Sequence, residues 1–241
     1  MRYLVNIKYD GSNFNGFQIQ KNDRTIQGEI TKVLNKILND EIKIVGCSRT
    51  DAGVHANDFY FHFDSLKDLD IQKLKHSLNS LLPDDIYVKN VKLVNDEFHA
   101  RYSVKDKEYK YVINEGEYDP VKRNYELEYC KTIDTEKLEE AAKKLIGEKD
   151  FKAFTSDNEK ENTIRCVKYI RIERVNKIVN IYVNANGFLK YMVRNIIGLL
   201  LEINEGKKKI EDIDKIIESK DRTNLGICAS SNGLYLNKVN Y

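Results

Sequence analysis

The first part of the chain changes hydrophobic period several times. Apolar side chains at every second position predict a strand over 2–9, and spacings of three and four then predict a helix over 26–38. Leu74 and Leu78 begin a second helical stripe, which Pro83 ends. Further strands are expected at 42–45, 58–63 and 86–94. The outline is β-α-β-β-α-β, the order of a ferredoxin-like unit.

The second part of the chain echoes this order. The remaining patterns predict a strand at 107–113, a helix at 138–146 ended by Gly147, a hairpin of 171–175 and 178–183 turning at Asn176-Lys177, helices at 188–201 and 210–217, and a closing strand at 233–241. We therefore expect an α+β fold with two similar mixed units, 1–104 and 105–241. Each is an antiparallel sheet flanked by helices, ferredoxin- or RRM-like, and the two are expected to form a central cleft.

Composition excludes several classes of protein. The 241 residues carry a formal charge of +2, so a nucleic-acid site must arise from local clustering of cations. The cysteines and histidines lack disulfide or metal-ligand spacing, and no phosphate-binding glycine loop is present, so we expect no metal and no cofactor. The apolar run 196–201 is too short for a membrane span. The apolar stretch near the start of the chain is too short for a signal peptide. A cytoplasmic protein without membrane contact is expected.

The segment GCSRTDAGVH, residues 46–55, carries the first candidate chemistry. It lies between two predicted strands and places Arg49 two residues before Asp51. In an arbitrary loop, Asp51 is most often a turn residue, Arg49 a solvated charge and His55 a hydrogen-bonded structural histidine. For His55 we keep that interpretation.

Two residues of the second part also need explanation. Tyr109 could be one of 15 tyrosines that fill a sheet face. Arg194 lies within the apolar run FLKYMVRNIIGLLL, where a buried guanidinium without a carboxylate partner is costly. Arg194 therefore predicts an acid nearby.

An ordered series of motifs resembles the TruA-type tRNA pseudouridine synthases over nearly the whole chain. The motifs are YDGSNFNGFQIQ (9–20), RTDAGVHA (49–56), FHARYS (98–103), KEYKYVI (107–113), DFKAF (150–154), FLKYMVRNIIG (188–198) and GLYL (233–236). A lone T-D-A-G would carry little weight, but the series in this order is specific.

The resemblance implies an isomerase that needs no cofactor and converts uridine to pseudouridine in tRNA. It implies that Asp51 is the essential aspartate, that Tyr109 borders the uracil, and that Arg194 pairs with Asp51. It also implies RNA contacts by Arg49, which helps to flip the base, and by Arg101. The implied substrate is the anticodon stem-loop of tRNA, at positions 38, 39 and 40, and the implied assembly is a homodimer.

The chain departs from the family pattern at a few positions, and two other functions stay open. Asn15 and Phe17 replace histidine and tryptophan, Cys47-Ser48 replace Ala-Gly, and residues 229–231 lack a proline. One alternative is a hydrolase that uses Asp51 with Asp58 as an acid–base pair. The other is a catalytically silent RNA-binding protein on the same fold.

Overall fold

The computed structural model describes residues 1–157, 159 and 161–241. Their contacts group into two compact units, Met1–Lys105 with Tyr235–Tyr241, and Asp106–Leu234. Helices and mostly antiparallel strands occur in both, which confirms the α+β class. The predicted division placed all of 105–241 in the second unit, whereas Lys105 and Tyr235–Tyr241 group with the first. In the described part of the chain, no helix combines the length and apolarity needed to cross a bilayer.

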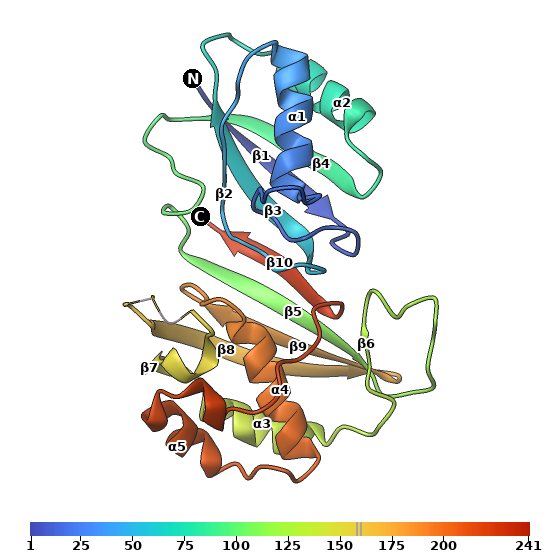
Figure 1. The fold of residues 1–241 in the computed structure, drawn as a ribbon, viewed down its shortest axis with the longest axis vertical. Coiled ribbons are helices and arrows are strands. Elements are labelled where there is room, and N and C mark those ends of the chain that lie inside the picture. Colours follow the sequence, from blue (N-terminus) through green and yellow to red (C-terminus); the bar gives the residue numbers. More distant parts are fainter. Residues whose placement is uncertain (158, 160) are drawn as a thin grey trace. The chain divides into compact units, whose positions relative to one another are not determined.

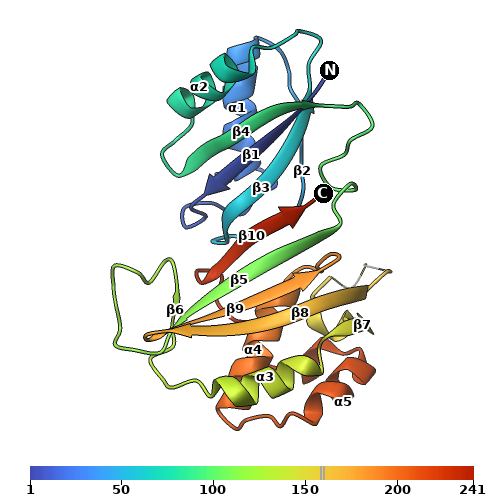
Figure 2. The same ribbon diagram turned by 180° about the vertical axis from the view of Figure 1, so that it is seen from behind.

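The first unit is a sheet with helices on one face. Its elements are β1 (Arg2–Tyr9), α1 (Ile26–Leu38), β2 (Ile44–Gly46), β3 (His55–Asp64), α2 (Ile71–Leu81), β4 (Ile86–Val94) and β10 (Leu234–Asn240). The strand order is β4-β1-β3-β10, and β2 pairs with β3. β1 runs antiparallel to β3 and β4, whereas β10 runs parallel to β3. Figures 1 and 2 show α1 and α2 on the same face of this sheet.

The core of the first unit lies between that face and the helices. The register pairs Val5 with Phe61 and Ile7 with Phe59, so these four side chains point the same way, and all are fully buried. The predicted strands 2–9 and 86–94 and the helix 26–38 are confirmed. β3 starts earlier than the predicted 58, since Ala56 already pairs with Tyr9.

The second unit is also built on antiparallel pairs. Its elements are β5 (Asp106–Asn114), β6 (Leu127–Glu128), α3 (Thr135–Lys143), β7 (Gly147–Asp150), η1 (Lys152–Phe154), β8 (Ile164–Val175), β9 (Ile178–Ala185), α4 (Met192–Asn204), α5 (Asp212–Ser219) and η2 (Arg222–Asn224). The strand order is β5-β9-β8-β7, with β6 beside β5. The hairpin predicted at Asn176-Lys177 is confirmed, because Val175 pairs with Ile178 and Asn176 is left-handed, with φ 56°.

Two predicted boundaries in the second unit were wrong. Gly147 does not end a helix: α3 stops at Lys143, and Gly147, with φ 97°, opens β7 by pairing with Val167. The helix expected from Phe188 begins at Met192, because Tyr191 has φ 63° and a left-handed residue cannot lie inside a right-handed helix.

The two units share an arrangement of strands. In the first, β1 pairs antiparallel with β3 and β3 with β2, and α1 follows β1. In the second, β5 pairs antiparallel with β9 and β9 with β8, and α3 follows β5. The echo in the sequence thus corresponds to a shared topology.

The start of α1 gives a stability prediction. The Thr25 side chain, almost fully buried, accepts a hydrogen bond of 3.2 Å from the Gly28 N–H. Thr25→Ala removes this cap and is expected to lower the free energy of unfolding by about 1 kcal/mol. Thr25→Ser keeps the hydroxyl and should retain most of the stability that the cap contributes. Urea denaturation measures both, and equal losses in the two variants would contradict the capping role.

Candidate functional site

The loop from Cys47 to Val54 joins β2 to β3, and the segment after β1 holds its backbone. The Phe17 N–H donates to the Thr50 carbonyl at 3.1 Å, and the Gly53 N–H donates to the Phe14 carbonyl at 3.2 Å. The Thr50 hydroxyl lies 2.8 Å from the buried hydroxyl of Tyr9. Main chain and side chain of Thr50 are therefore both fixed.

Two glycines of the first motif let the segments approach this closely. A Cβ on Gly11 would lie 2.0 Å from the Val54 carbonyl oxygen, and one on Gly16 would lie 2.6 Å from that of Thr50. Gly16 also has φ 84°, which disfavours any other residue. Gly16 is thus required by the backbone of the RTD loop, residues 49–51, and Gly11 by the backbone of Val54 just after it.

The RTD loop presents its two charged residues around a buried centre. Thr50 is buried, Asp51 is half-buried and Arg49 is exposed. The Val54 N–H donates to the Asp51 carbonyl at 3.2 Å, so the chain turns directly after Asp51. Arg49 and Asp51 therefore flank an anchored residue on one loop. The roles predicted for them, flipping the base for Arg49 and reacting with it for Asp51, stay predictions.

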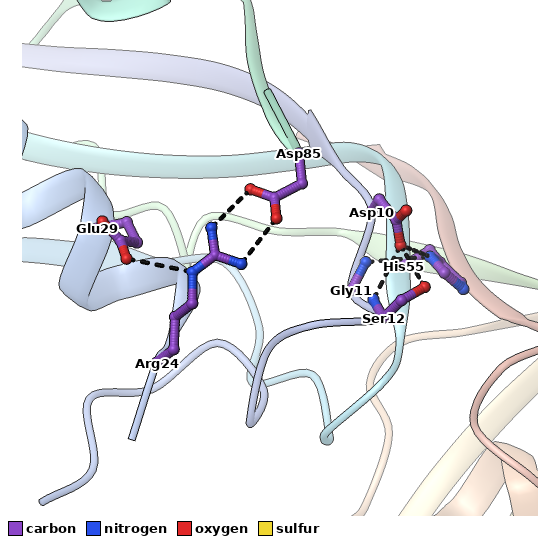
Figure 3. Close-up of polar contacts among 7 residues, drawn as sticks. All are labelled: Asp10, Gly11, Ser12, Arg24, Glu29, His55 and Asp85. Atoms are coloured by element: carbon purple, nitrogen blue, oxygen red, sulfur yellow. Dashed lines mark hydrogen bonds and ion pairs between the residues drawn. The ribbon is translucent and has the colours of Figure 1, made fainter. Parts of the chain in front are cut away.

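His55 has the structural role predicted for it. Its Nδ1 lies 3.1 Å from the Gly11 backbone nitrogen and 3.2 Å from Oδ1 of Asp10 (Figure 3). Nδ1 cannot accept from Gly11 and donate to Asp10 together. Because Asp10 Oδ1 already accepts the N–H and hydroxyl of Ser12, at 2.9 and 2.6 Å, we assign Nδ1 as the acceptor from Gly11. The ring stacks on Tyr235 of β10, with centroids 4.6 Å apart.

Arg24 secures the other end of the segment after β1, a contact that the sequence did not predict. Its guanidinium donates to both oxygens of Asp85, at 2.8 and 3.0 Å, and its Nε donates to Glu29 at 3.3 Å (Figure 3). It also lies 4.1 Å from the centroid of the Phe14 ring. The hydrogen bonds with Asp85 raise the pKa of Arg24. These partners are far apart in the chain, so no motif spacing reveals them.

The departures from the family motif in this segment are structural. Asn15 donates from its backbone to the Arg24 carbonyl at 2.9 Å and from its side chain to Asp23 at 2.8 Å. Phe17 is buried and stacks on Phe59, with ring centroids 4.4 Å apart. Asn15 and Phe17 therefore both make contacts that hold the segment in place.

Asp58, the second acid of the hydrolase alternative, is committed to other contacts. Its Oδ1 accepts from Asn6 at 2.8 Å and from Lys89 at 3.0 Å, and its Oδ2 accepts from the Val239 N–H at 3.3 Å. A carboxylate that ties three strands together is poorly suited to shuttle protons. This geometry disfavours the pairing of Asp51 with Asp58 as acid and base.

Arg101 lies in a compact turn of the first unit, after β4. Its backbone N–H donates to Nδ1 of His99 at 3.1 Å, and the Ala100 N–H donates to Nδ1 of His62 at 3.1 Å. The Arg101 side chain is half-buried. The turn fixes the backbone of Arg101, and the RNA contact predicted for its side chain stays a prediction.

The second unit contributes Tyr109 and Arg194. Tyr109 of β5 is buried and meets the ring of Phe188 edge-on, with centroids 5.0 Å apart. Arg194, in the first turn of α4, is half-buried and donates from Nε to the Ala229 carbonyl at 2.7 Å. The Ala229 N–H returns a bond of 3.1 Å to the Arg194 carbonyl, which a proline at 229 could not make. The side chain of Arg194 is thus partly exposed to solvent.

The predicted site residues are thus distributed over both units. Arg49, Asp51 and Arg101 belong to the first, and Tyr109 and Arg194 belong to the second. The pairing of Asp51 with Arg194 stays a prediction. Within the described ranges, no three His, Cys, Asp or Glu side chains come together in a group that could hold a metal ion.

Comparison with known proteins gives a consistent result. The family model described as "tRNA pseudouridine synthase" matches residues 6–103 and 141–241. A protein of Thermoanaerobacter sp. (strain X514), named tRNA pseudouridine synthase A, is 43% identical over 240 residues, covering 99% of this chain and 98% of that protein. A Bacillus cereus protein named tRNA pseudouridine synthase A 2 is 42% identical, covering 99% of each chain. One of Staphylococcus aureus (strain MSSA476), named tRNA pseudouridine synthase A, is 39% identical, covering 99% of this chain and 90% of its own.

The approach of Gly16 to the RTD loop can be tested against a second left-handed glycine. Gly16→Ala is expected to displace the Thr50 carbonyl and to speed amide hydrogen exchange in peptides covering 47–54. Gly206 has a similar φ of 72° but nothing within 4 Å of its Cβ direction, so Gly206→Ala introduces the backbone strain alone. Exchange measured by mass spectrometry should change in this loop only for Gly16→Ala. Equal exchange of 47–54 in the two variants would disprove the steric argument.

His62 gives a pH-dependent prediction for the turn that carries Arg101. Burial, foremost, and the nearby Arg2 lower the pKa of His62 to about 4 from an ordinary 6.5. As the pH falls, His62 therefore gains its proton at a higher pH in the unfolded chain than in the folded protein. The contribution of His62 to stability is therefore complete above pH 6.5 and is lost as the pH falls from 6.5 to 4.

Labelled-histidine NMR should show the His62 resonance titrating near pH 4. Carboxylates titrate in the same range, so urea midpoints are compared with those of His62→Asn, which keeps an acceptor near Nδ1 but does not titrate. The wild-type midpoint should fall more steeply between pH 6.5 and 4. A His62 resonance that titrates near 6.5 would contradict the prediction.

Proposed function

Because the chain belongs to the tRNA pseudouridine synthase family, we propose that it modifies uridines 38, 39 and 40 in the anticodon stem-loop, with Asp51 as the catalytic carboxylate. That the protein is an isomerase acting on tRNA follows from its family. The positions, the residues that act, a homodimeric assembly and a cytoplasmic location are the proposal.

The reaction exchanges one bond to the sugar for another. The N1–C1′ bond of uridine breaks, the uracil turns, and a C5–C1′ bond forms. The hydrogen of C5 leaves to solvent and N1 gains one, so nothing is consumed. Positive character develops at C1′ as the first bond breaks. A carboxylate can stabilise this charge, attack C1′ covalently, or remove the C5 proton.

The anchored backbone of the RTD loop is the observation that carries the proposal. Thr50 is held by the N–H of Phe17 and the hydroxyl of Tyr9, so the residue before Asp51 is fixed at two points. A carboxylate on such a loop loses little conformational freedom when it meets its substrate. This rigidity suits a group that must stay aligned with C1′ while the base turns.

Arg194 and Tyr109 are proposed to complete the site. α4 begins after the left-handed Tyr191 without a side-chain cap, so its first turn carries the positive end of the helix dipole. Arg194 adds a full charge in that turn, and its bond to Ala229 orients the guanidinium. Both features favour an anion, and we propose that Arg194 pairs with Asp51. Tyr109, held edge-on by Phe188, is proposed to border the uracil.

Arg49 and Arg101 are proposed to hold the RNA. A uridine within a stem-loop must leave its stack to reach a carboxylate on a protein loop. Arg49 is exposed two residues before Asp51, which allows it to occupy the space that the base leaves. Arg101 is proposed to contact a phosphate, because scattered cations on a nearly neutral protein bind RNA through such contacts.

The test measures tritium released from uridine C5 in labelled tRNA. Asp51→Asn keeps the size of the side chain but removes its charge, so single-turnover release should fall at least ~10³-fold. Affinity for tRNA should stay within a few-fold. Asp58→Asn is the matched control in the same unit, and it should retain turnover once the folded fraction is measured.

Four outcomes would reject parts of this proposal. Full release by Asp51→Asn would remove Asp51 from the reaction, and release of free uracil that keeps its C5 tritium would favour the hydrolase alternative. Unaltered protein that binds tRNA without releasing tritium would support the silent RNA-binding protein. Transcripts with a single uridine at 38, 39 or 40 test the positions, and release from none of them would reject the anticodon stem-loop.

A further inference from the structure

Tyr102 is an exposed aromatic ring on an otherwise well-packed turn of the first unit. Its exposed fraction is 78%, whereas Phe98 and His99 just before it are half-buried. One face of the ring stacks on His99, with centroids 4.2 Å apart and an angle of 26° between the planes. The exposed fraction implies that most of the other face is open to solvent.

The turn that carries Tyr102 is held from several directions. Nδ1 of His99 accepts the N–H of both Arg101 and Tyr102, at 3.1 and 3.2 Å. The His99 N–H donates to the Ser103 hydroxyl at 3.0 Å. The ring is therefore supported by its own backbone as well as by the imidazole beneath it.

A second layer of contacts fixes the turn to the sheet. Nδ1 of His62, on β3, accepts the Ala100 N–H, and the Tyr241 hydroxyl donates to the Ala100 carbonyl at 2.8 Å. Arg2 of β1 donates to the Phe98 carbonyl at 2.8 Å. In Figures 1 and 2 this segment, between β4 and β5, runs beside the C-terminal end of the chain. Holding an exposed ring this firmly does not bury it, so packing alone does not account for the arrangement.

An aromatic face of this kind, with an arginine as the preceding residue in the chain, suits one class of ligand. Nucleobases stack on tyrosine rings, and an adjacent arginine reaches the phosphate of the same or the next nucleotide. A pre-ordered ring adds affinity because little side-chain entropy remains to be lost on binding. We propose that Tyr102 is a base-stacking residue for tRNA and that the turn 98–103 positions it, with His99 as the support of the ring.

RNA explains the surface better than a second copy of this chain does. A stable interface between proteins buries on the order of 1,200 Å² or more around apolar residues. The two residues that flank Tyr102 in the chain, Arg101 and Ser103, and the His99 that supports its ring are polar or charged. A single ring in such surroundings offers a nucleotide-sized contact.

The chain contains no tryptophan, so Tyr102→Trp places a single tryptophan, which can be excited apart from the tyrosines, at the proposed contact. Adding tRNA should quench its emission with a saturable dependence on concentration, since a stacked base quenches an indole. Tyr87→Trp is the matched control: Tyr87 is 46% exposed on β4 of the same unit, with Lys8 above its ring. Its emission should change little.

Affinity gives the second measurement. Tyr102→Ala is expected to weaken tRNA binding on the order of tenfold, and Tyr102→Phe should restore most of the affinity because it keeps the stacking face. KM for tRNA should rise with the loss of affinity, whereas kcat should change much less. Thermal unfolding of Tyr102→Ala checks that the turn remains folded.

The inference rests on tRNA as the substrate, and its failure is distinguishable from failure of the proposed catalytic role. Failure of the unaltered protein to release tritium would reject the proposed catalytic role. The stacking role of Tyr102 would be overturned if Tyr102→Trp bound tRNA in a filter-retention assay without quenching. Unchanged tRNA affinity of Tyr102→Ala would also overturn it. A changed sedimentation coefficient of Tyr102→Ala without a change in tRNA affinity would assign the ring to an interface between protomers instead.

Discussion

The first unit depends on one close approach between two loops, in which the backbone after β1 lies against the backbone before β3. Side chains cannot mediate this approach, because carbonyl oxygens of 47–54 occupy the space that a Cβ on Gly11 or Gly16 would need. Hydrogen bonds from Phe17 and Gly53 take the place of those that the two segments would otherwise make with water. The position of Asp51 is thus set by main chain rather than by rotamers.

This arrangement separates the residues that position the loop from the charged residues that the loop exposes. Thr50, Tyr9, Phe17 and His55 are buried and act as supports. The charged residues between them, Arg49 and Asp51, are left partly or fully exposed on a loop whose path is already determined. Arg24 supports the same segment from its far end, and its contacts with Asp85 and Glu29 commit its charge to structure.

Much of the fold could be predicted from hydrophobic periodicity, and the failures have local causes. The helix 26–38 was predictable because its apolar positions follow one helical period throughout. The strand 86–94 was predicted as well, although its alternation of buried positions shifts after Val88, where its pairing with β1 is irregular. Tyr191 delayed the start of α4, since its left-handed conformation leaves no mark on that pattern. β7 carries four residues, GEKD, with no alternation at all, and it exists because β8 offers it a partner. The motif, not the periodicity, predicted Asp51 as the catalytic residue. The contacts of Arg24 and the exposure of Tyr102 depend on tertiary neighbours, so neither was visible in the sequence.

The last strand carries a consequence for biosynthesis. β10 pairs Tyr235 with His55 and Leu236 with Ala56, and the Tyr235 ring stacks on the imidazole directly after the RTD loop. A ribosome makes residues 235–241 only after the whole of the second unit, 106–234, has been polymerised. The nascent first unit must therefore wait with an incomplete sheet, while the uninterrupted second unit can fold ahead of it. The sheet of the first unit can therefore be completed only after the second unit has been made, and a ribosome-bound chain lacking that strand should have a less ordered loop at 47–54.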